Sequence, residues 1–125
     1  MATIKSYTSV EQSKKLAEFL PLESADMEYL SIKENGALVG AVPFVKDDSE
    51  VEDSAYSHIY DRIACWSLAA LLGVLPKVIN NETLFIETSS ALWHIGYRNI
   101  YTARTDNPVD ACYELILKLN ELRML

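Results

Sequence analysis

The sequence predicts an α+β fold. The chain has 125 residues, the length of one domain, and 50% of them are apolar and 23% charged, as in ordinary globular proteins. Segments with the spacing of amphipathic helices alternate with segments that resemble paired β-strands. We therefore expect a single domain over residues 1–125, built on a mostly antiparallel sheet of four to five strands. The expected elements are a hairpin over 27–43, strands within 82–103, and about three helices packed on one face of the sheet, over 9–20, 67–75 and 108–123.

The first helix has a clear start signal. Ser9 can accept a hydrogen bond from the amide three residues on, and Gln12 can reach back to the Ser9 amide, which together make a capping box. Leu16, Phe19 and Leu20 then fall on one helical face. Pro21 ends the helix, because the residue before a proline disfavours helical backbone angles.

The hairpin is predicted by its turn. Asn35-Gly36 separates two strand-like segments within 27–43. This dipeptide favours a type I′ turn, which needs positive φ at both central residues and joins antiparallel strands directly.

The second helix is short and apolar. Ser67 is a good N-cap, and Pro76 closes the run that begins at Leu68. Trp66 lies just before the cap and Leu71 at the fourth helical position, which is the spacing of a hydrophobic staple. Packing alone therefore accounts for Trp66.

The segment 82–103 predicts further strands. "ETLFIET" and "ALWHIGYRN" are joined at Ser89-Ser90, and "IYTAR" follows as a short third strand.

The last helix carries the strongest pattern. Asn107 caps it, Pro108 occupies the first turn, and Asp110 places negative charge near the positive end of the helix dipole. Its apolar stripe consists of Val109, Cys112, Ile116, Leu119 and Leu122, with Leu115 beside it.

Three aromatic residues are candidates for an interaction surface. Tyr29, Phe85 and Tyr101 are expected to point away from the helices, on an aromatic face of the sheet. Exposed aromatic patches mark protein interfaces more often than catalytic sites. This face, or a self-pairing strand edge, could also form a homodimer; the alternative is that another part of the chain covers it.

Cys65 raises the possibility of catalysis. "CW" before an apolar helix resembles the nucleophile of papain-like peptidases, His94 in "WHIGY" could act as the base, and Asn99 could orient it. Short bacterial cell-wall peptidases of that superfamily carry a similar His-apolar-Gly stretch. However, Leu68 replaces the glycine that commonly follows the nucleophile, and few residues separate the cysteine from the histidine. We therefore expect a packed Cys65 and no enzymatic activity.

The charge excludes some partners. The net charge of −7 and the lack of a basic cluster argue against direct binding to nucleic acid, whose phosphates require clustered Lys and Arg. An acidic surface mainly maintains solubility. The alternative is nucleic-acid mimicry, in which carboxylates occupy the basic groove of a DNA- or RNA-binding protein.

Two acidic features are possible cation sites. The segment 46–53, "KDDSEVED", lacks the glycine and closing glutamate of a calcium loop, so we expect solvated charge. His58 and Asp61 could share a metal, but they have no clear third ligand. We expect neither a metal nor a cofactor.

The expected compartment is the cytoplasm. The sequence contains no apolar run long enough to cross a membrane and no signal-peptide core near its start, so we expect no membrane association. Cys65 and Cys112 are expected to be reduced, packed thiols.

Much of the chain resembles a group of small proteins from gut Bacteroidales and their phages and mobile elements, for which no activity is assigned. The resemblance lies in "SVEQSKKLAEFLPLESADMEY", "WSLAALLGVLPKVI" and "NPVDACYELILKLNE". It implies a phage or mobile-element accessory factor and no functional residues. Our expectation is a non-enzymatic protein that binds another protein.

Overall fold

The structure is a computed structural model that describes residues 5–34, 37–46 and 60–125. The chain divides into two compact units: unit 1 comprises Met1–Thr8 and Ser67–Leu125, and unit 2 comprises Ser9–Trp66. Unit 2 is thus inserted into the sequence of unit 1. The single-domain organisation stays a prediction.

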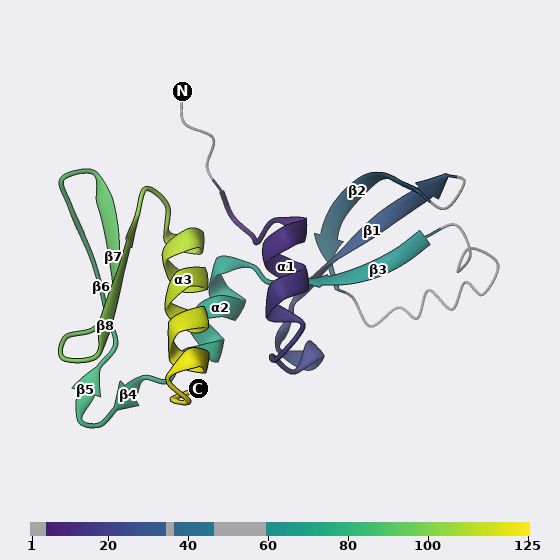
Figure 1. The fold of residues 1–125 in the computed structure, drawn as a ribbon. Helices are drawn as coiled ribbons and strands as arrows, with labels where there is room; N and C mark the ends of the chain where they lie inside the picture. The colour runs from purple at the N-terminus through teal and green to yellow at the C-terminus, as the bar shows by residue number, and fades with distance from the viewer. Residues whose placement is uncertain (1–4, 35–36, 47–59) are drawn as a thin grey trace. The chain divides into compact units, whose positions relative to one another are not determined.

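Within the described residues, three α-helices and eight strands form a mixed α+β structure (Figure 1), which confirms the predicted class. Unit 2 holds α1 (Val10–Leu16), the 3-10 helix η1 (Leu22–Ser24), β1 (Met27–Glu34), β2 (Ala37–Val45) and β3 (Tyr60–Cys65). Unit 1 holds α2 (Leu68–Val74), β4 (Val78–Ile79), β5 (Glu82–Thr83), β6 (Phe85–Ser89), β7 (Leu92–Tyr97), β8 (Tyr101–Thr105) and α3 (Pro108–Glu121).

The prediction of one sheet of four to five strands was wrong. The described strands form three antiparallel sheets, ordered β2-β1-β3, β4-β5 and β6-β7-β8. The physical reason is that β1 has β3 on its second edge, and β3 was not predicted as a strand. The predicted strand at 82–88 is also divided, because β5 pairs with β4 and β6 pairs with β7. The Leu84 N–H extends the pairing with β4 by donating to the carbonyl of Lys77.

The prediction that the helices pack on one face of a single sheet was also wrong. In unit 2, α1 packs against β3, whereas in unit 1, α3 packs against β7, β8 and α2. Each three-stranded sheet therefore has a helix from its own unit, and α2 contributes to the core through α3.

The capping box that begins α1 is confirmed. The Gln12 N–H donates to Ser9 Oγ at 3.1 Å, and the Ser9 N–H donates to Gln12 Oε1 at 3.0 Å. The helix ends at Leu16 rather than at residue 20. Its last turn tightens, because the Phe19 N–H donates to the Leu16 carbonyl three residues back, before Pro21 is reached.

The hairpin of unit 2 is confirmed as an antiparallel pair of β1 and β2, in which Glu34 lies opposite Ala37. A register shift at Ile32/Lys33 adds one residue to β2 and forms a bulge. The predicted Asn35-Gly36 turn lies outside the described residues.

Trp66 ends unit 2 in a fully buried position. Its indole N–H donates to Ser24 Oγ at 3.0 Å, and the Ser24 hydroxyl donates to the Pro21 carbonyl at 2.5 Å. Trp66 thereby fixes η1 within unit 2. The hydrophobic staple to Leu71 stays a prediction.

In unit 1, the residues before and after the insertion lie side by side. Tyr7 forms an antiparallel bridge with Ser67, and the Leu68 N–H donates to the Ser6 carbonyl at 3.1 Å. The Ser67 side chain accepts from the Ala70 N–H, which confirms it as the N-cap of α2. Both ends of the inserted segment therefore leave unit 1 at one place.

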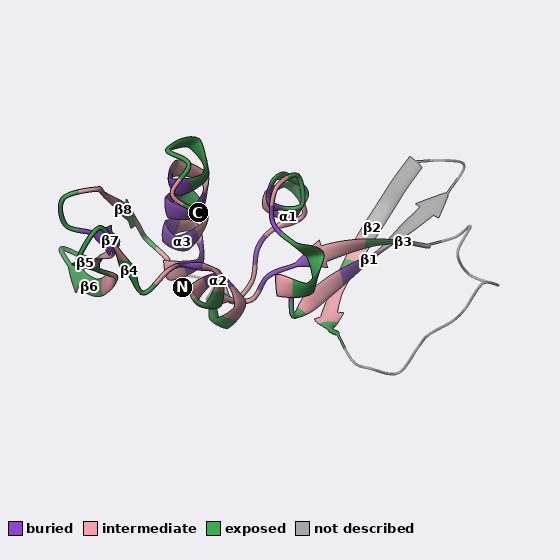
Figure 2. Cartoon of the chain, turned by 90° about the horizontal axis from the view of Figure 1, so that it is seen from below, coloured by how far each residue is buried: buried purple, intermediate pink, exposed green. Residues whose placement is uncertain are grey.

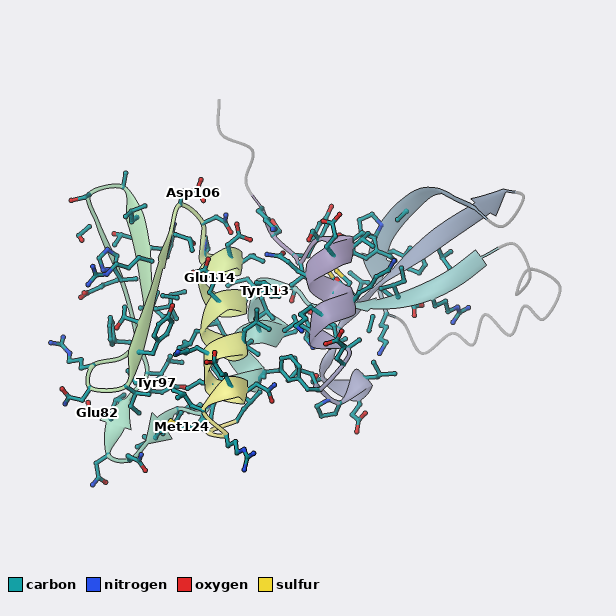
Figure 3. The ribbon with its side chains drawn as sticks, viewed as in Figure 1. Glu82, Tyr97, Asp106, Tyr113, Glu114 and Met124 are labelled. Atoms are coloured by element: carbon teal, nitrogen blue, oxygen red, sulfur yellow. The ribbon has the colours of Figure 1, made fainter. Side chains whose placement is uncertain are left out.

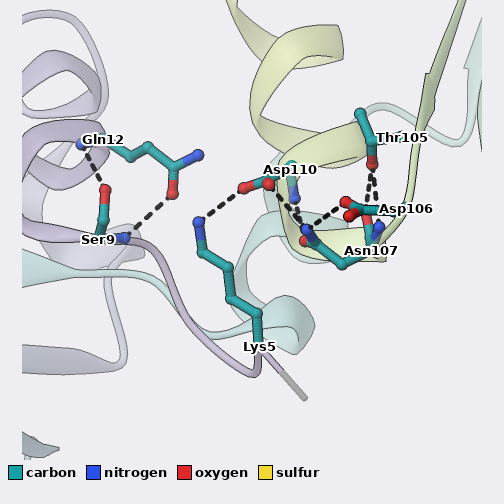
Figure 4. A network of polar contacts seen from close by, with 7 residues as sticks. All are labelled: Lys5, Ser9, Gln12, Thr105, Asp106, Asn107 and Asp110. Carbon is teal, nitrogen blue, oxygen red and sulfur yellow. Dashed lines mark hydrogen bonds and ion pairs between the residues drawn. The ribbon is translucent and has the colours of Figure 1, made fainter. Parts of the chain in front are cut away.

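The start of α3 is fixed by a polar network (Figure 4). Asn107 Oδ1 accepts from the Asp110 N–H at 2.8 Å, which confirms the predicted cap, and Pro108 occupies the first turn. The Lys5 ammonium lies 2.6 Å from Asp110 Oδ1, so residue 5 is tied to this helix start. The Asp110 carboxylate, which is favourable at the N-terminus of α3, thus also holds the N-terminal segment through Lys5.

One side of α3 forms the main core of unit 1 (Figure 2). Its buried residues are Val109, Ala111, Cys112, Leu115, Ile116 and Leu119. Leu122, predicted on the same stripe, is exposed because the helix ends at Glu121. The Arg123 N–H donates to Asn120 and the Met124 N–H to Leu119, a Schellman motif with Arg123 at positive φ.

The β6–β7 turn consists of Ser90-Ala91 rather than Ser89-Ser90, because Ser89 pairs with Leu92. Ser90 and Ala91 both have positive φ, which is costly for residues with a Cβ. We expect Ala91→Gly to raise the free energy of unfolding by about 0.5–1 kcal/mol, measured by urea denaturation. An unchanged or lower stability would show that this turn carries no such strain.

Candidate interaction surface

The three predicted aromatic residues do not share a sheet. Tyr29 lies in β1 of unit 2 and is only 6% exposed, whereas Phe85 and Tyr101 lie in β6 and β8 of unit 1. Tyr29 shares its side of β1 with Met27, which pairs with the buried Cys65. The prediction of one aromatic sheet face was therefore wrong.

Phe85 and Tyr101 are partly buried, and each has a cation near its ring. The Arg98 guanidinium lies 5.5 Å from the centre of the Phe85 ring, and the Lys118 ammonium lies 5.7 Å from that of Tyr101. Lys118 belongs to α3, so Tyr101 lies toward this helix rather than away from it. The buried Tyr97 of β7 (Figure 3) pairs with Tyr101 of β8, so the two side chains lie on the same side of this sheet.

The three residues of the peptidase alternative have separate surroundings. Cys65 is fully buried at the end of β3 in unit 2, whereas His94 lies in β7 of unit 1. The Asn99 amide donates to Glu82 Oε1 at 2.5 Å, so it orients this carboxylate. The peptidase alternative stays an untested hypothesis.

His94 lies on the side of its sheet away from Ile95 and Tyr97. Its Nε2 is 3.2 Å from Ser89 Oγ, and the ladder places Glu87 and Arg104 directly opposite it on the neighbouring strands. Among the described residues, Ser89 is the one hydrogen-bond partner of the ring. A catalytic serine–histidine pair also needs a carboxylate bound to the second ring nitrogen. The row Glu87-His94-Arg104 is therefore better described as a polar sheet surface.

Metal binding finds no support in the described part of the chain. No cluster of three or more His, Cys, Asp or Glu side chains lies there in a suitable arrangement. His58 and residues 47–53, which belong to the two features considered as possible cation sites, lie outside the described residues.

Cys112 and Tyr97 are buried ionisable groups in the core of unit 1. Burial raises the pKa of the Cys112 thiol from its ordinary value of 9.0 to about 12. Burial, followed by the nearby Cys112, raises the pKa of Tyr97 from 10.0 to about 12, and the Tyr97 hydroxyl donates to the Pro76 carbonyl. Cys112 is therefore a packing residue rather than a nucleophile.

These shifts predict a loss of stability in alkali. Both groups remain neutral in the folded chain after their unfolded counterparts have ionised, so their contribution is complete below pH 9.0 and is lost as pH approaches about 12. We expect the urea midpoint to fall across this window and to fall less in Cys112→Ala. A decline equal in both proteins would contradict the role of the thiol.

A partly apolar sheet surface lies in unit 2 and was not predicted from the sequence. Two rows cross the three strands, Phe44-Glu28-Ala64 and Val42-Leu30-Arg62. They alternate with the buried Tyr29 and Cys65, so they occupy the opposite side of the sheet. We call the six residues of these rows the outer face.

The outer face combines apolar surface with one ion pair. Val42 is 56% exposed, while Leu30, Phe44 and Ala64 are partly buried. Glu28 Oε1 lies 3.7 Å from Arg62 Nη1, and Arg62 is half exposed. Protein interfaces combine an apolar core with a polar rim, and arginine is enriched in them.

The net charge is concentrated in unit 2. Unit 2 contains 12 of the 18 acidic and 5 of the 11 basic residues of the chain, whereas unit 1 contains six of each. The whole net charge of −7 therefore belongs to unit 2.

The chain matches no family model, no curated protein and no solved structure in the comparisons made. None of the helices in the described ranges is long and apolar enough to cross a membrane.

Proposed function

We propose that this chain is a non-enzymatic accessory protein of the cytoplasm that binds another protein through the outer face of unit 2. The observation that carries the proposal is the exposure of Val42, 56%, within a row that also contains Leu30. Covering such apolar surface removes it from water and favours association. The proposal needs no metal or cofactor.

The origin in a phage or mobile element rests on the sequence resemblance alone. The segments that carry this resemblance, around Ser9, Trp66 and Cys112, fold as capped helices or their immediate flanks. The overall acidity of the chain argues against direct binding to nucleic acid.

A pair of matched substitutions tests the proposed surface. Val42→Lys places a charge on the outer face, whereas Val78→Lys makes the same change in unit 1, at a valine that is 57% exposed. We expect tagged wild-type protein and Val78→Lys to retain the same partner from a Bacteroidales lysate, and Val42→Lys to lose at least about 90% of it, since burying an unpaired ammonium costs several kcal/mol.

The two variants can be compared directly because each gains one positive charge. Equal retention by all three proteins would refute the outer face as the binding surface. Equal loss in both variants would show a general charge effect rather than a local contact. Circular dichroism on each variant confirms that the fold is intact before capture.

The segregation of charge supports a second candidate, a nucleic-acid mimic. Unit 2 carries the whole net charge, so it could occupy a basic groove of a DNA- or RNA-binding protein. This candidate predicts capture that weakens steeply with ionic strength, whereas capture through the apolar outer face is little affected by salt.

A second copy of the chain is a further possible occupant of the outer face. Sedimentation velocity tests it, because Val42→Lys would shift a concentration-dependent dimer to monomer and Val78→Lys would not. A wild-type protein that is monomeric at every concentration removes the homodimer.

A further inference from the structure

Among the described residues, no strand pairs with the outer edge of β2, and this edge differs from the other edges of the two three-stranded sheets. In the two three-stranded sheets described, the edge strands are β2, β3, β6 and β8. Three of them contain at least one charged residue: Arg62 in β3, Glu87 in β6 and Arg104 in β8. The nine residues of β2 contain none. A long, uncharged edge is a template for pairing with another strand.

Hydrogen bonding fixes which β2 groups point outward. The Lys46 N–H donates to the Asp26 carbonyl at 3.0 Å, so Lys46 faces β1. Because hydrogen-bonded pairs alternate along an antiparallel ladder, Phe44 and Val42 also face β1, whereas Ala41, Pro43 and Val45 direct their backbone groups to the free edge.

Pro43 therefore lies between the outward-facing residues Ala41 and Val45. A proline has no N–H, so the edge lacks a backbone donor at this position. Its neighbours are otherwise suited to strand addition: Val42 and Val45 are exposed, and the free edge offers no charge that would repel a second copy.

We infer that Pro43 acts as a gatekeeper that prevents β2 from pairing edge to edge with β2 of a second copy of this chain. In a symmetric antiparallel pairing centred on this position, each chain would lack one donor opposite a partner carbonyl. The inference is independent of the proposed function, because it concerns the backbone edge and not the side chains of the outer face.

Pro43→Thr tests the inference in the full chain. Threonine restores the N–H and favours strands, so self-association should tighten about tenfold or more relative to wild type, the equivalent of two net backbone hydrogen bonds. Sedimentation velocity over a wide concentration range measures the change. The amide of residue 43 should become protected from hydrogen exchange as the chain associates.

A second variant separates edge pairing from other contacts. In Pro43→Thr/Val45→Lys, a charge is added to the same strand at an exposed residue outside the outer face, and self-association should return to the wild-type level. The inference is overturned if Pro43→Thr sediments as wild type with an unprotected amide at residue 43. Association that persists in the double variant would also overturn it, because the contact would then lie elsewhere.

Discussion

Replacing Gly96 with alanine is expected to destabilise unit 1 by at least about 3 kcal/mol. A Cβ on Gly96 would lie 2.2 Å from the backbone oxygen of Tyr101 and 2.6 Å from the Cα of Thr102. Both atoms belong to the backbone of β8, which the Ile100 N–H to Tyr97 carbonyl bond holds in a short turn after β7. The strands would have to separate, and urea denaturation measures the loss.

Gly73→Ala is the matched control for this prediction. Gly73 lies exposed in α2, and a Cβ there would meet nothing within 4 Å. Since alanine favours helix over glycine, we expect a gain of about 0.5–1 kcal/mol. The same chemical change should therefore have opposite signs at the two positions. If the urea midpoint of Gly96→Ala equals that of the wild type, the close approach of β7 and β8 at Gly96 is contradicted.

Replacing Trp66 with alanine is expected to cost about 3–5 kcal/mol, the usual range for a fully buried aromatic residue. Trp66 is fully buried, and its indole joins it to Ser24, whose hydroxyl in turn binds Pro21. The substitution removes both the packing and this link to η1. The free energy of unfolding, obtained from denaturant titration by circular dichroism, gives the cost.

Trp66→Phe separates the two contributions. Phenylalanine keeps much of the apolar surface but removes the indole N–H, and Ser24 Oγ keeps its own bond to the Pro21 carbonyl. We expect a smaller loss than for alanine, with about 1 kcal/mol of it from the hydrogen bond. A cost below about 1 kcal/mol for Trp66→Ala would contradict a structural role for this residue.

The helix starts could be predicted from the sequence because their signals are local. Ser9 with Gln12, Ser67, and Asn107 with Pro108 each lie within a few residues of the groups they bind. The helix ends were less certain. Leu16 ends α1 before Pro21 is reached, because a tightened turn satisfies the last carbonyls first.

The division into three sheets could not be predicted, because strand pairing is not local. Tyr60–Cys65 contains the adjacent charged residues Asp61 and Arg62 and no clear alternation of polar and apolar residues. Its assignment as a strand depends on pairing with β1, far away in the sequence. Once β3 pairs there, strands β6, β7 and β8 form a sheet of their own.

The candidate surface shows the same limit on local information. Alternation places Tyr29 and Leu30 on opposite sides of β1, but the burial of Tyr29 and Cys65 in the structure is needed to show which side is covered. The sequence does contain a signal for the outer face, the uncharged run of β2. Without the strand order, that run could equally have been a buried central strand.

Binding of another protein through the outer face is tested most directly by photo-crosslinking at Val42. A photoreactive phenylalanine analogue is placed at residue 42 on the outer face, or at the equally exposed residue 78 in unit 1, and the full chain is irradiated in cells of the Bacteroidales group that the proposed origin names. We predict one discrete adduct with another protein from position 42 and no such adduct from position 78. No adduct from position 42, or the same adducts from both positions, would contradict binding through the outer face.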